Sequence, residues 1–141
     1  SMVSDANGPW VSEFMAIKPR GSVQHLGSRV NCRLADGKNA WDALAVLFPA
    51  ITAAGIPKAP AYELIRKHET APRMLYSGAV LRADSDGSLD AALVLRTVYQ
   101  HAGKAWLRAG AGIVLGSTPA REHEETCEKL SSVAPYVVAQ D

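Results

Sequence analysis

Aromatic residues are scarce in this sequence, at 6% of 141 residues, and an excess of charge of one sign is lacking. Fifteen Lys and Arg residues balance fourteen Asp and Glu residues, for a formal net charge of +1. Binding to a phosphate backbone requires a basic surface, so we do not expect nucleic acid as a partner. No apolar run approaches the roughly 20 residues that span a bilayer, so we expect no membrane partner either.

Cysteine and secretion signals are equally sparse. Only Cys32 and Cys127 are present, and their separation matches no metal-ligand spacing. No basic stretch followed by an apolar segment opens the chain. We therefore expect a cytoplasmic protein with two reduced, structural thiols.

The remaining composition, 48% hydrophobic and 21% charged, is typical of one globular domain. Ser1 and Met2 resemble a tag scar, and residues 1–13 are interpreted as this scar with a flexible lead-in. We expect the domain to cover residues 14–139.

Hydrophobic periodicity and turn residues predict a mixed α+β chain. Asn39 and Asp42 resemble a capping box, and Thr118 followed by Pro119 predicts another helix start. Trp41, at helical spacing from further apolar residues, predicts a core-facing stripe that also contains Leu44, Ala45 and Phe48. The predicted helices cover residues 39–48, 60–68 and 118–133, and the last is expected to turn Cys127, Leu130 and Val133 towards the core. The predicted strands cover residues 14–17, 22–34, 75–81, 89–99 and 104–114. This grouping favours an antiparallel β-sheet with packed helices.

The last predicted helix carries the most informative polar pattern. Glu122, Glu125 and Lys129 are three and four residues apart and therefore share one face. Two such carboxylates can hold Mg²⁺ together with water and substrate oxygens. An equally simple interpretation is a solvated acidic face with a Glu–Lys ion pair, and spacing by itself favours the latter.

Three further sites carry weaker signals. Arg96 lies inside the apolar predicted strand 89–99, where its guanidinium either binds a carboxylate in a cleft, forms a structural ion pair or occupies a solvated strand position. Gly110 and Gly112 let the backbone approach a ligand, or else mark a bend in the sheet. His25, in a predicted strand, is more often a structural histidine than a catalytic one.

Several blocks of this sequence form an ordered series. The blocks are Val23-Gln24-His25-Leu26, Phe48-Pro49-Ala50 with Thr52, Gly55-Ile56-Pro57-Lys58, Pro72-Arg73 with Tyr76-Ser77-Gly78, Leu95-Arg96-Thr97, residues 109–114 and residues 124–129. Taken together, they resemble the C-terminal portion of the chorismate-utilising enzymes. The resemblance is strongest to the salicylate synthases of siderophore pathways and covers roughly residues 14–139.

The resemblance implies a role for each matching residue. Tyr76 and Arg96 would bind the enolpyruvyl carboxylate of the substrate, and Lys129 would assist at the ring carboxylate. His25 would lie at the reacting ring, and Thr52 would contact the substrate. The remaining implied roles are backbone contacts from Gly110 and Gly112 and Mg²⁺ binding by Glu125 and Glu122.

The sequence also departs from the family pattern. Family enzymes are considerably longer, and their general base, their general acid and other Mg²⁺-binding carboxylates lie in segments that this sequence does not contain. Lys58 matches a different family lysine and does not replace the base. Met74 stands where a glycine is usual and is expected to crowd the loop beside Tyr76. The family fold is a two-layer α/β sandwich, so we expect a partial version completed by homo-oligomerisation.

Three functions follow as hypotheses. The first is a compact enzyme that binds chorismate or isochorismate and catalyses a pericyclic or lyase-type reaction on this or a related cyclic carboxylate. The second is an inactive fragment of a full-length salicylate synthase. The third is a non-catalytic binding or partner protein that completes the sheet of another subunit.

Overall fold

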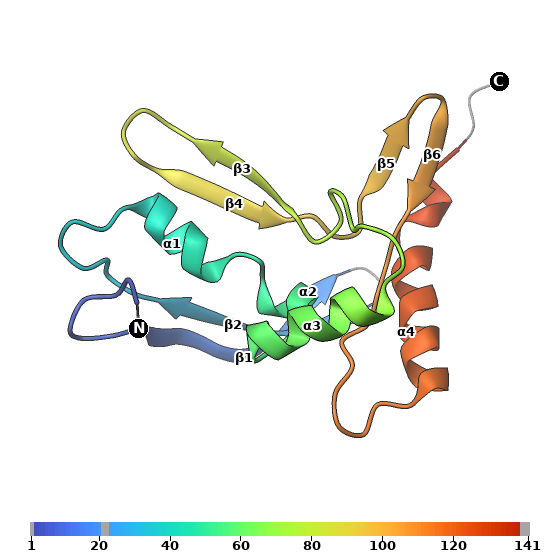
Figure 1. The fold of residues 1–141 in the computed structure, drawn as a ribbon, viewed down its shortest axis with the longest axis horizontal. Coiled ribbons are helices and arrows are strands. Elements are labelled where there is room, and N and C mark those ends of the chain that lie inside the picture. Colours follow the sequence, from blue (N-terminus) through green and yellow to red (C-terminus); the bar gives the residue numbers. More distant parts are fainter. Residues whose placement is uncertain (1, 21–22, 139–141) are drawn as a thin grey trace. The chain divides into compact units, whose positions relative to one another are not determined.

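The computed structural model describes residues 2–20 and 23–138 (Figure 1). The chain divides into two compact units. Unit 1 contains Ser1–Phe48 and Ala83–Leu89, and unit 2 contains Pro49–Arg82 and Asp90–Asp141.

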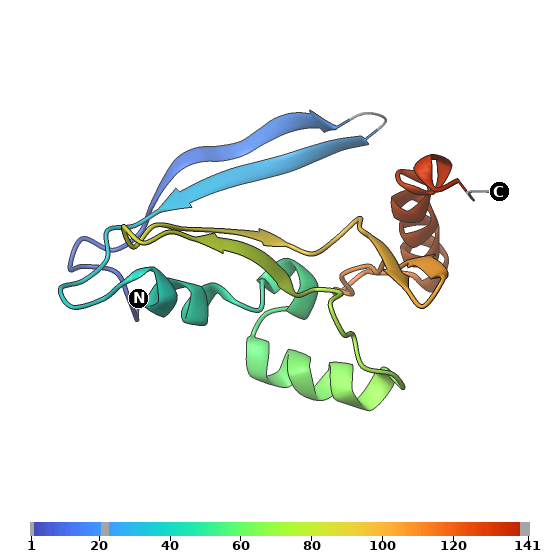
Figure 2. The ribbon, with the colours of Figure 1, turned by 90° about the horizontal axis from the view of Figure 1, so that it is seen from above.

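Unit 1 is built on a long antiparallel hairpin of β1 (Trp10–Arg20) and β2 (Val23–Asn31), drawn as a blue ribbon in Figure 2. β1 begins at Trp10 rather than at Phe14, so the end of the expected flexible lead-in is a strand. The register pairs Ile17 with Leu26 and breaks at bulges between Val11 and Ala16. At this irregularity Met15 has a φ of 45°, and its N–H donates a hydrogen bond to Ser28 Oγ at 3.0 Å.

Helix α1 (Ala40–Leu47) follows in unit 1 and begins as the sequence predicts. Asn39 Oδ1 accepts hydrogen bonds from Trp41 N at 2.9 Å and Asp42 N at 3.2 Å, while Asp42 Oδ2 accepts one from Asn39 N at 3.0 Å. This reciprocal capping box satisfies N–H groups that have no partner within the helix.

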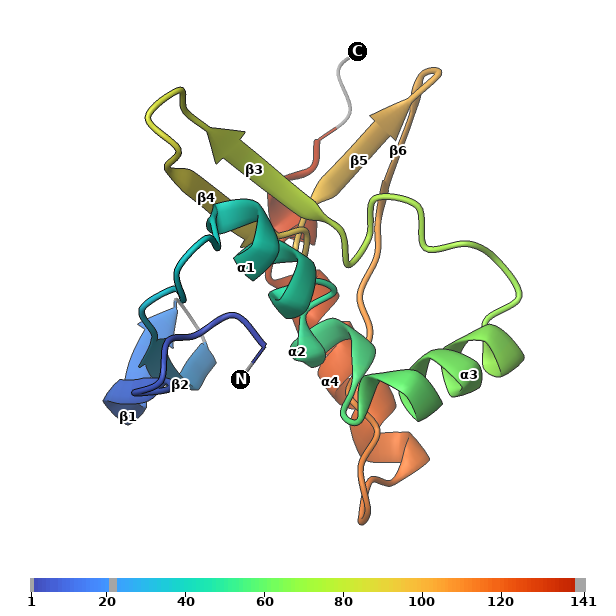
Figure 3. The same ribbon diagram turned by 60° about the vertical axis from the view of Figure 1, so that its left-hand side comes forward.

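Unit 2 contains several helices, and Figure 3 shows the bend at which its first helix leads into its second helix. They are α2 (Ile51–Ala54), α3 (Lys58–His68), α4 (Pro119–Ser131) and the 3₁₀ turn η1 (Ala134–Tyr136). α2 was not predicted, and α3 begins two residues earlier than expected. Thr118 caps α4, because its Oγ1 accepts a hydrogen bond from Arg121 N at 3.4 Å.

β1 is longer than predicted and the other strands are shorter, and the expectation of one sheet is wrong. Within the described residues they form three two-stranded sheets, β1–β2, β3–β4 and β5–β6. The predicted strand 75–81 is replaced by turns followed by β3 (Ala79–Ala83). The predicted strand 89–99 divides into β4 (Leu89–Leu93) and β5 (Val98–His101). Of the predicted strand 104–114, the first four residues form β6 (Lys104–Leu107). The α+β class is confirmed, as a set of hairpins with helices.

Little apolar surface is buried within the described chain. Its buried apolar residues are Ala54, Val94 and Tyr99. The predicted core stripe is uncovered, with Trp41 54% exposed, and both cysteines are free and exposed rather than structural.

A membrane span is not formed by any single helix of the described residues. By length and composition, the bent pair of segments Ala40–Ala54 and Lys58–His68 could cross a membrane.

Candidate functional site

Tyr76 and Gly110 meet in unit 2 although they are distant in the sequence. Tyr76 lies in the turn segment before β3, and Gly110 lies in the extended segment after β6. A Cβ atom added to Gly110 would lie 2.9 Å from Tyr76 Oη, too close for any real side chain. A Cβ atom at Gly112 would meet nothing within 4 Å. Close approach of the tyrosine hydroxyl therefore requires glycine at position 110 and not at position 112.

Helix α4 extends this contact through Lys129. Lys129 Nζ donates a hydrogen bond to the Gly110 carbonyl oxygen at 3.0 Å and lies 2.6 Å from Glu125 Oε1. The hydrogen bond from Lys129 holds the pKa of the Glu125 carboxyl below its ordinary value, so this group is anionic at neutral pH. Tyr76, Gly110, Lys129 and Glu125 thus form one continuous series of contacts, which we call the tyrosine–lysine series.

The predicted ion pair on α4 is present as the Glu125–Lys129 contact. Glu122 lies one turn before Glu125, half-buried, and its backbone carbonyl accepts a hydrogen bond from Thr126 Oγ1 at 2.9 Å. The expected core-facing edge of α4 is half-buried at Leu130 and exposed at Cys127.

The other predicted site residues lie on separate elements. Arg96 is not part of a strand: it is exposed, has a φ of 51° and occupies the bend between β4 and β5. Thr52 is exposed on α2. The backbone of His25 pairs with Lys18 in the hairpin of unit 1, and its side chain lies outside the described part of the structure.

Met74 does not crowd the loop beside Tyr76, contrary to expectation. Its side chain is 83% exposed, and its backbone has a φ of 53°. The departure from glycine therefore acts on the backbone, because a side chain disfavours this left-handed conformation.

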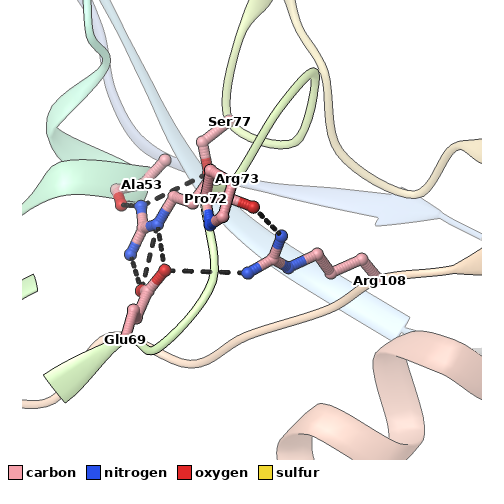
Figure 4. A network of polar contacts seen from close by, with 6 residues as sticks. All are labelled: Ala53, Glu69, Pro72, Arg73, Ser77 and Arg108. Atoms are coloured by element: carbon pink, nitrogen blue, oxygen red, sulfur yellow. Dashed lines mark hydrogen bonds and ion pairs between the residues drawn. The ribbon is translucent and has the colours of Figure 1, made fainter.

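A polar network that the sequence analysis missed fastens the Tyr76 segment to the helices (Figure 4). Arg73 Nε donates to both carboxylate oxygens of Glu69, at 3.0 and 2.9 Å, and Arg73 Nη2 contacts the same carboxylate. Arg73 Nη1 donates to the Ala53 carbonyl oxygen at 2.6 Å, which ties α2 to the same group. These hydrogen bonds lower the pKa of the Glu69 carboxyl and raise the pKa of Arg73.

Arg108 completes this network from the end of β6. Its Nη1 donates to the Pro72 carbonyl oxygen at 3.1 Å, and its Nη2 lies 3.7 Å from Glu69 Oε2 (Figure 4). Its guanidinium carbon lies 5.2 Å from the centre of the Tyr76 ring, a cation–π arrangement. Glu69 and Arg73 lie four residues apart in the sequence, but both follow the last residue of α3, so helical spacing does not predict their contact.

The carboxylates of α4 offer a limited metal site. Within residues 2–20 and 23–138 no group of three His, Cys, Asp or Glu side chains is placed to hold a metal ion. Glu122 and Glu125 provide two carboxylates, and Mg²⁺ commonly takes one or two from a protein and its other ligands from water and substrate. Their donor chemistry fits Mg²⁺, although Lys129 already contacts Oε1 of Glu125.

Comparison with known proteins places these residues in a family. A family model described as chorismate binding enzyme matches residues 1–135. The chain belongs to the chorismate binding enzyme family. The resemblance read from the sequence is thereby confirmed.

The chain is similar to several other proteins of this kind. It is 59% identical over 130 residues to a salicylate synthase of Mycolicibacterium paratuberculosis, covering 92% of this chain and 29% of that protein. It is 38% identical over 132 residues to anthranilate synthase component 1 of Bacillus subtilis, covering 93% of this chain and 26% of that protein.

A solved structure has the same fold. Anthranilate synthase component I of Streptococcus pneumoniae TIGR4 matches with a TM-score of 0.86 and 35% identity, covering 93% of this chain and 30% of that chain. The chorismate-binding-family chain therefore spans less than a third of the length of each of these relatives.

Proposed function

We propose that residues 14–139 form part of a chorismate- or isochorismate-binding site of the salicylate synthase type. The observation that carries the proposal is the tyrosine–lysine series. It joins residues from three separate segments of the sequence, each of which the family resemblance assigns to the site. The similarity to a salicylate synthase supports the same substrate class.

In this proposal the substrate is a cyclic compound held by its carboxylates. Tyr76 donates a hydrogen bond to the enolpyruvyl carboxylate, and Arg96 pairs with the same group. Lys129 neutralises the ring carboxylate. The backbone of Gly110 and Gly112 contacts the substrate, as do the side chains of Thr52 and His25.

Magnesium is the proposed cofactor, held by Glu125 and Glu122. When bound, Mg²⁺ supplies positive charge that offsets the ring carboxylate of the substrate. The low pKa of the Glu125 carboxyl favours this role, because a hard cation binds the anionic form.

The proposed reaction is the loss of pyruvate from isochorismate. A pericyclic route for this step requires no general base or acid from the protein. The side chains need only hold the enolpyruvyl group over the ring and stabilise the charge that develops in the transition state. Arg96, Tyr76, His25 and Lys129 are the proposed catalytic residues.

The test is to measure binding by calorimetry, first of chorismate and then of isochorismate, with and without Mg²⁺, and to follow pyruvate release. Loss of a charge-assisted hydrogen bond weakens binding by about tenfold or more, so Arg96→Ala is expected to lower affinity and turnover by at least about tenfold. The control is Arg33→Ala, which removes the same charge from an exposed position in unit 1. Unchanged turnover in Arg96→Ala would contradict the proposal.

A second candidate function is a binding segment that acts only after another polypeptide covers it. The exposure of large apolar side chains, such as Phe14 at 76% and Ile113 at 74%, supports this alternative. It predicts that the chain alone binds no substrate and co-purifies with a larger homologue. Turnover by the chain alone would rule it out.

A further inference from the structure

Arg108 connects the two segments that meet at Tyr76. It lies two residues before Gly110 in the sequence, and its guanidinium reaches back across the loop that carries Tyr76 to the Pro72 carbonyl. The same group lies over the Tyr76 ring, while the hydroxyl of that ring lies against Gly110. The Arg108 side chain, just after β6, therefore contacts both the Tyr76 ring and the backbone of the segment that carries Tyr76. Gly110, which meets the Tyr76 hydroxyl, lies two residues further along the same segment.

The segment around Tyr76 needs such support. Met74 and Ser77 both have positive φ, at 53° and 65°, which costs about 1 kcal/mol or more for a residue with a side chain. Strained backbone of this kind persists when surrounding contacts hold it. Arg73 and Arg108 supply these contacts through Glu69, Ala53 and Pro72.

Arg73 and Arg108 differ in how closely they bind the Glu69 carboxylate. The Glu69 carboxylate is bonded closely by Arg73 and lies 3.7 Å from Arg108. One carboxylate therefore faces two guanidinium groups. It offsets the positive charge of Arg108, which lies over the Tyr76 ring, only in part. A cation over the ring strengthens the phenol as a hydrogen-bond donor towards an anion.

We propose that Arg108 is a positioning residue that holds the Tyr76 phenol at Gly110 so that its hydroxyl donates to the carboxylate of the substrate. The proposal rests on the proposed function, because it assigns the hydroxyl of Tyr76 to substrate binding. Arg108 acts through Tyr76 and touches no reacting atom. Glu69 and Arg73 fix the loop from its other side.

The first arm of the test needs no ligand. The full chain is labelled with ring-¹³C tyrosine, and Tyr76→Phe identifies the Tyr76 signal among the four tyrosines. Arg108→Ala is expected to move the Tyr76 signal towards that of an exposed tyrosine, while the signals of Tyr62 and Tyr136 and the whole spectrum of Arg33→Ala stay unchanged. An unmoved Tyr76 signal would overturn the proposal. If every signal moves, the variant has lost its fold, and Arg108→Gln, which removes the charge and keeps most of the aliphatic stem, decides by the same criterion.

The second arm is a double-mutant cycle on chorismate affinity. Arg108→Ala and Tyr76→Phe are each expected to weaken binding about tenfold, and the double variant to weaken it about tenfold and not a hundredfold. A structural strut that acts independently of the phenol would give the multiplied loss, which would overturn the proposal. If the wild-type chain binds no chorismate, the proposed function fails, and the first arm still decides whether Arg108 positions Tyr76.

Discussion

Gly110 offers the most direct test of the contact between this glycine and the Tyr76 hydroxyl. A methyl group at position 110 would meet Tyr76 Oη at 2.9 Å, so Gly110→Ala must displace the phenol. We expect Gly110→Ala to reduce chorismate affinity at least about tenfold, since the displaced hydroxyl no longer donates to the substrate. Arg33→Ala is the control, because Arg33 is exposed in unit 1 and has no assigned role in the site. Calorimetric titration of both variants checks this, and equal affinities for the two would contradict the assignment of Tyr76.

Tyr99 carries an unusual buried hydroxyl. The residue is 8% exposed and stacks on Trp106, and its Oη has no hydrogen-bond partner among the described residues. Burial raises the pKa of this phenol, so the hydroxyl is neutral at physiological pH. An unpaired buried hydroxyl costs about 1–3 kcal/mol, so we expect Tyr99→Phe to preserve or raise the free energy of unfolding, by up to about 1 kcal/mol. Urea denaturation measures the change, and a loss above about 1 kcal/mol would mean that the hydroxyl has a partner in solution.

At the scale of elements, the Glu69 network makes the attachment of the Tyr76 segment dependent on pH. Hydrogen bonds from Arg73 lower the pKa of the folded Glu69 carboxyl below its ordinary value of 4.5. A lowered folded pKa contributes stability that is present above pH 4.5 and is lost as the pH falls through the folded value. We expect Glu69→Gln to be less stable than wild type at pH 7 and to lose less stability between pH 5 and about pH 3. Urea denaturation midpoints of wild type and Glu69→Gln, measured at pH 7, pH 5 and about pH 3, test this expectation. An equal loss of stability in the two proteins between pH 5 and about pH 3 would contradict it.

The helices were largely predictable from sequence, and the sheets were not. Local signals define a helix start, as Asn39 with Asp42 and Thr118 with Pro119 show. Strand length depends on backbone conformations that side-chain patterns do not reveal: the positive φ of Arg96 interrupts the apolar stretch before β5. The Glu125–Lys129 contact follows from helical spacing, whereas Arg108 and Pro72 are 36 residues apart and only the fold brings them together.

At the scale of the whole molecule, the exposed surface is the dominant feature. Large apolar side chains are exposed on both units, such as Phe14 at 76% and Ile113 at 74%, and a stable protein–protein interface buries about 1,200–2,000 Å². Apolar burial contributes about 25 cal/mol per Å², so uncovered hairpin and helix faces favour association strongly. Among the described strands, β1–β2 and β5–β6 each present two open edges that a second copy can pair with.

We therefore predict that the chain forms a homodimer or a higher oligomer. Light scattering at micromolar concentration is expected to give at least twice the chain mass of 15.0 kDa, with dissociation on dilution. Chorismate titration of the same samples connects the assembly to the site: if association completes the binding site, affinity falls as the oligomer dissociates. A 15.0 kDa monomer at micromolar concentration would contradict the prediction. A monomer that binds only after addition of a larger homologue would instead favour the second candidate function, because the covering polypeptide would then be a different chain.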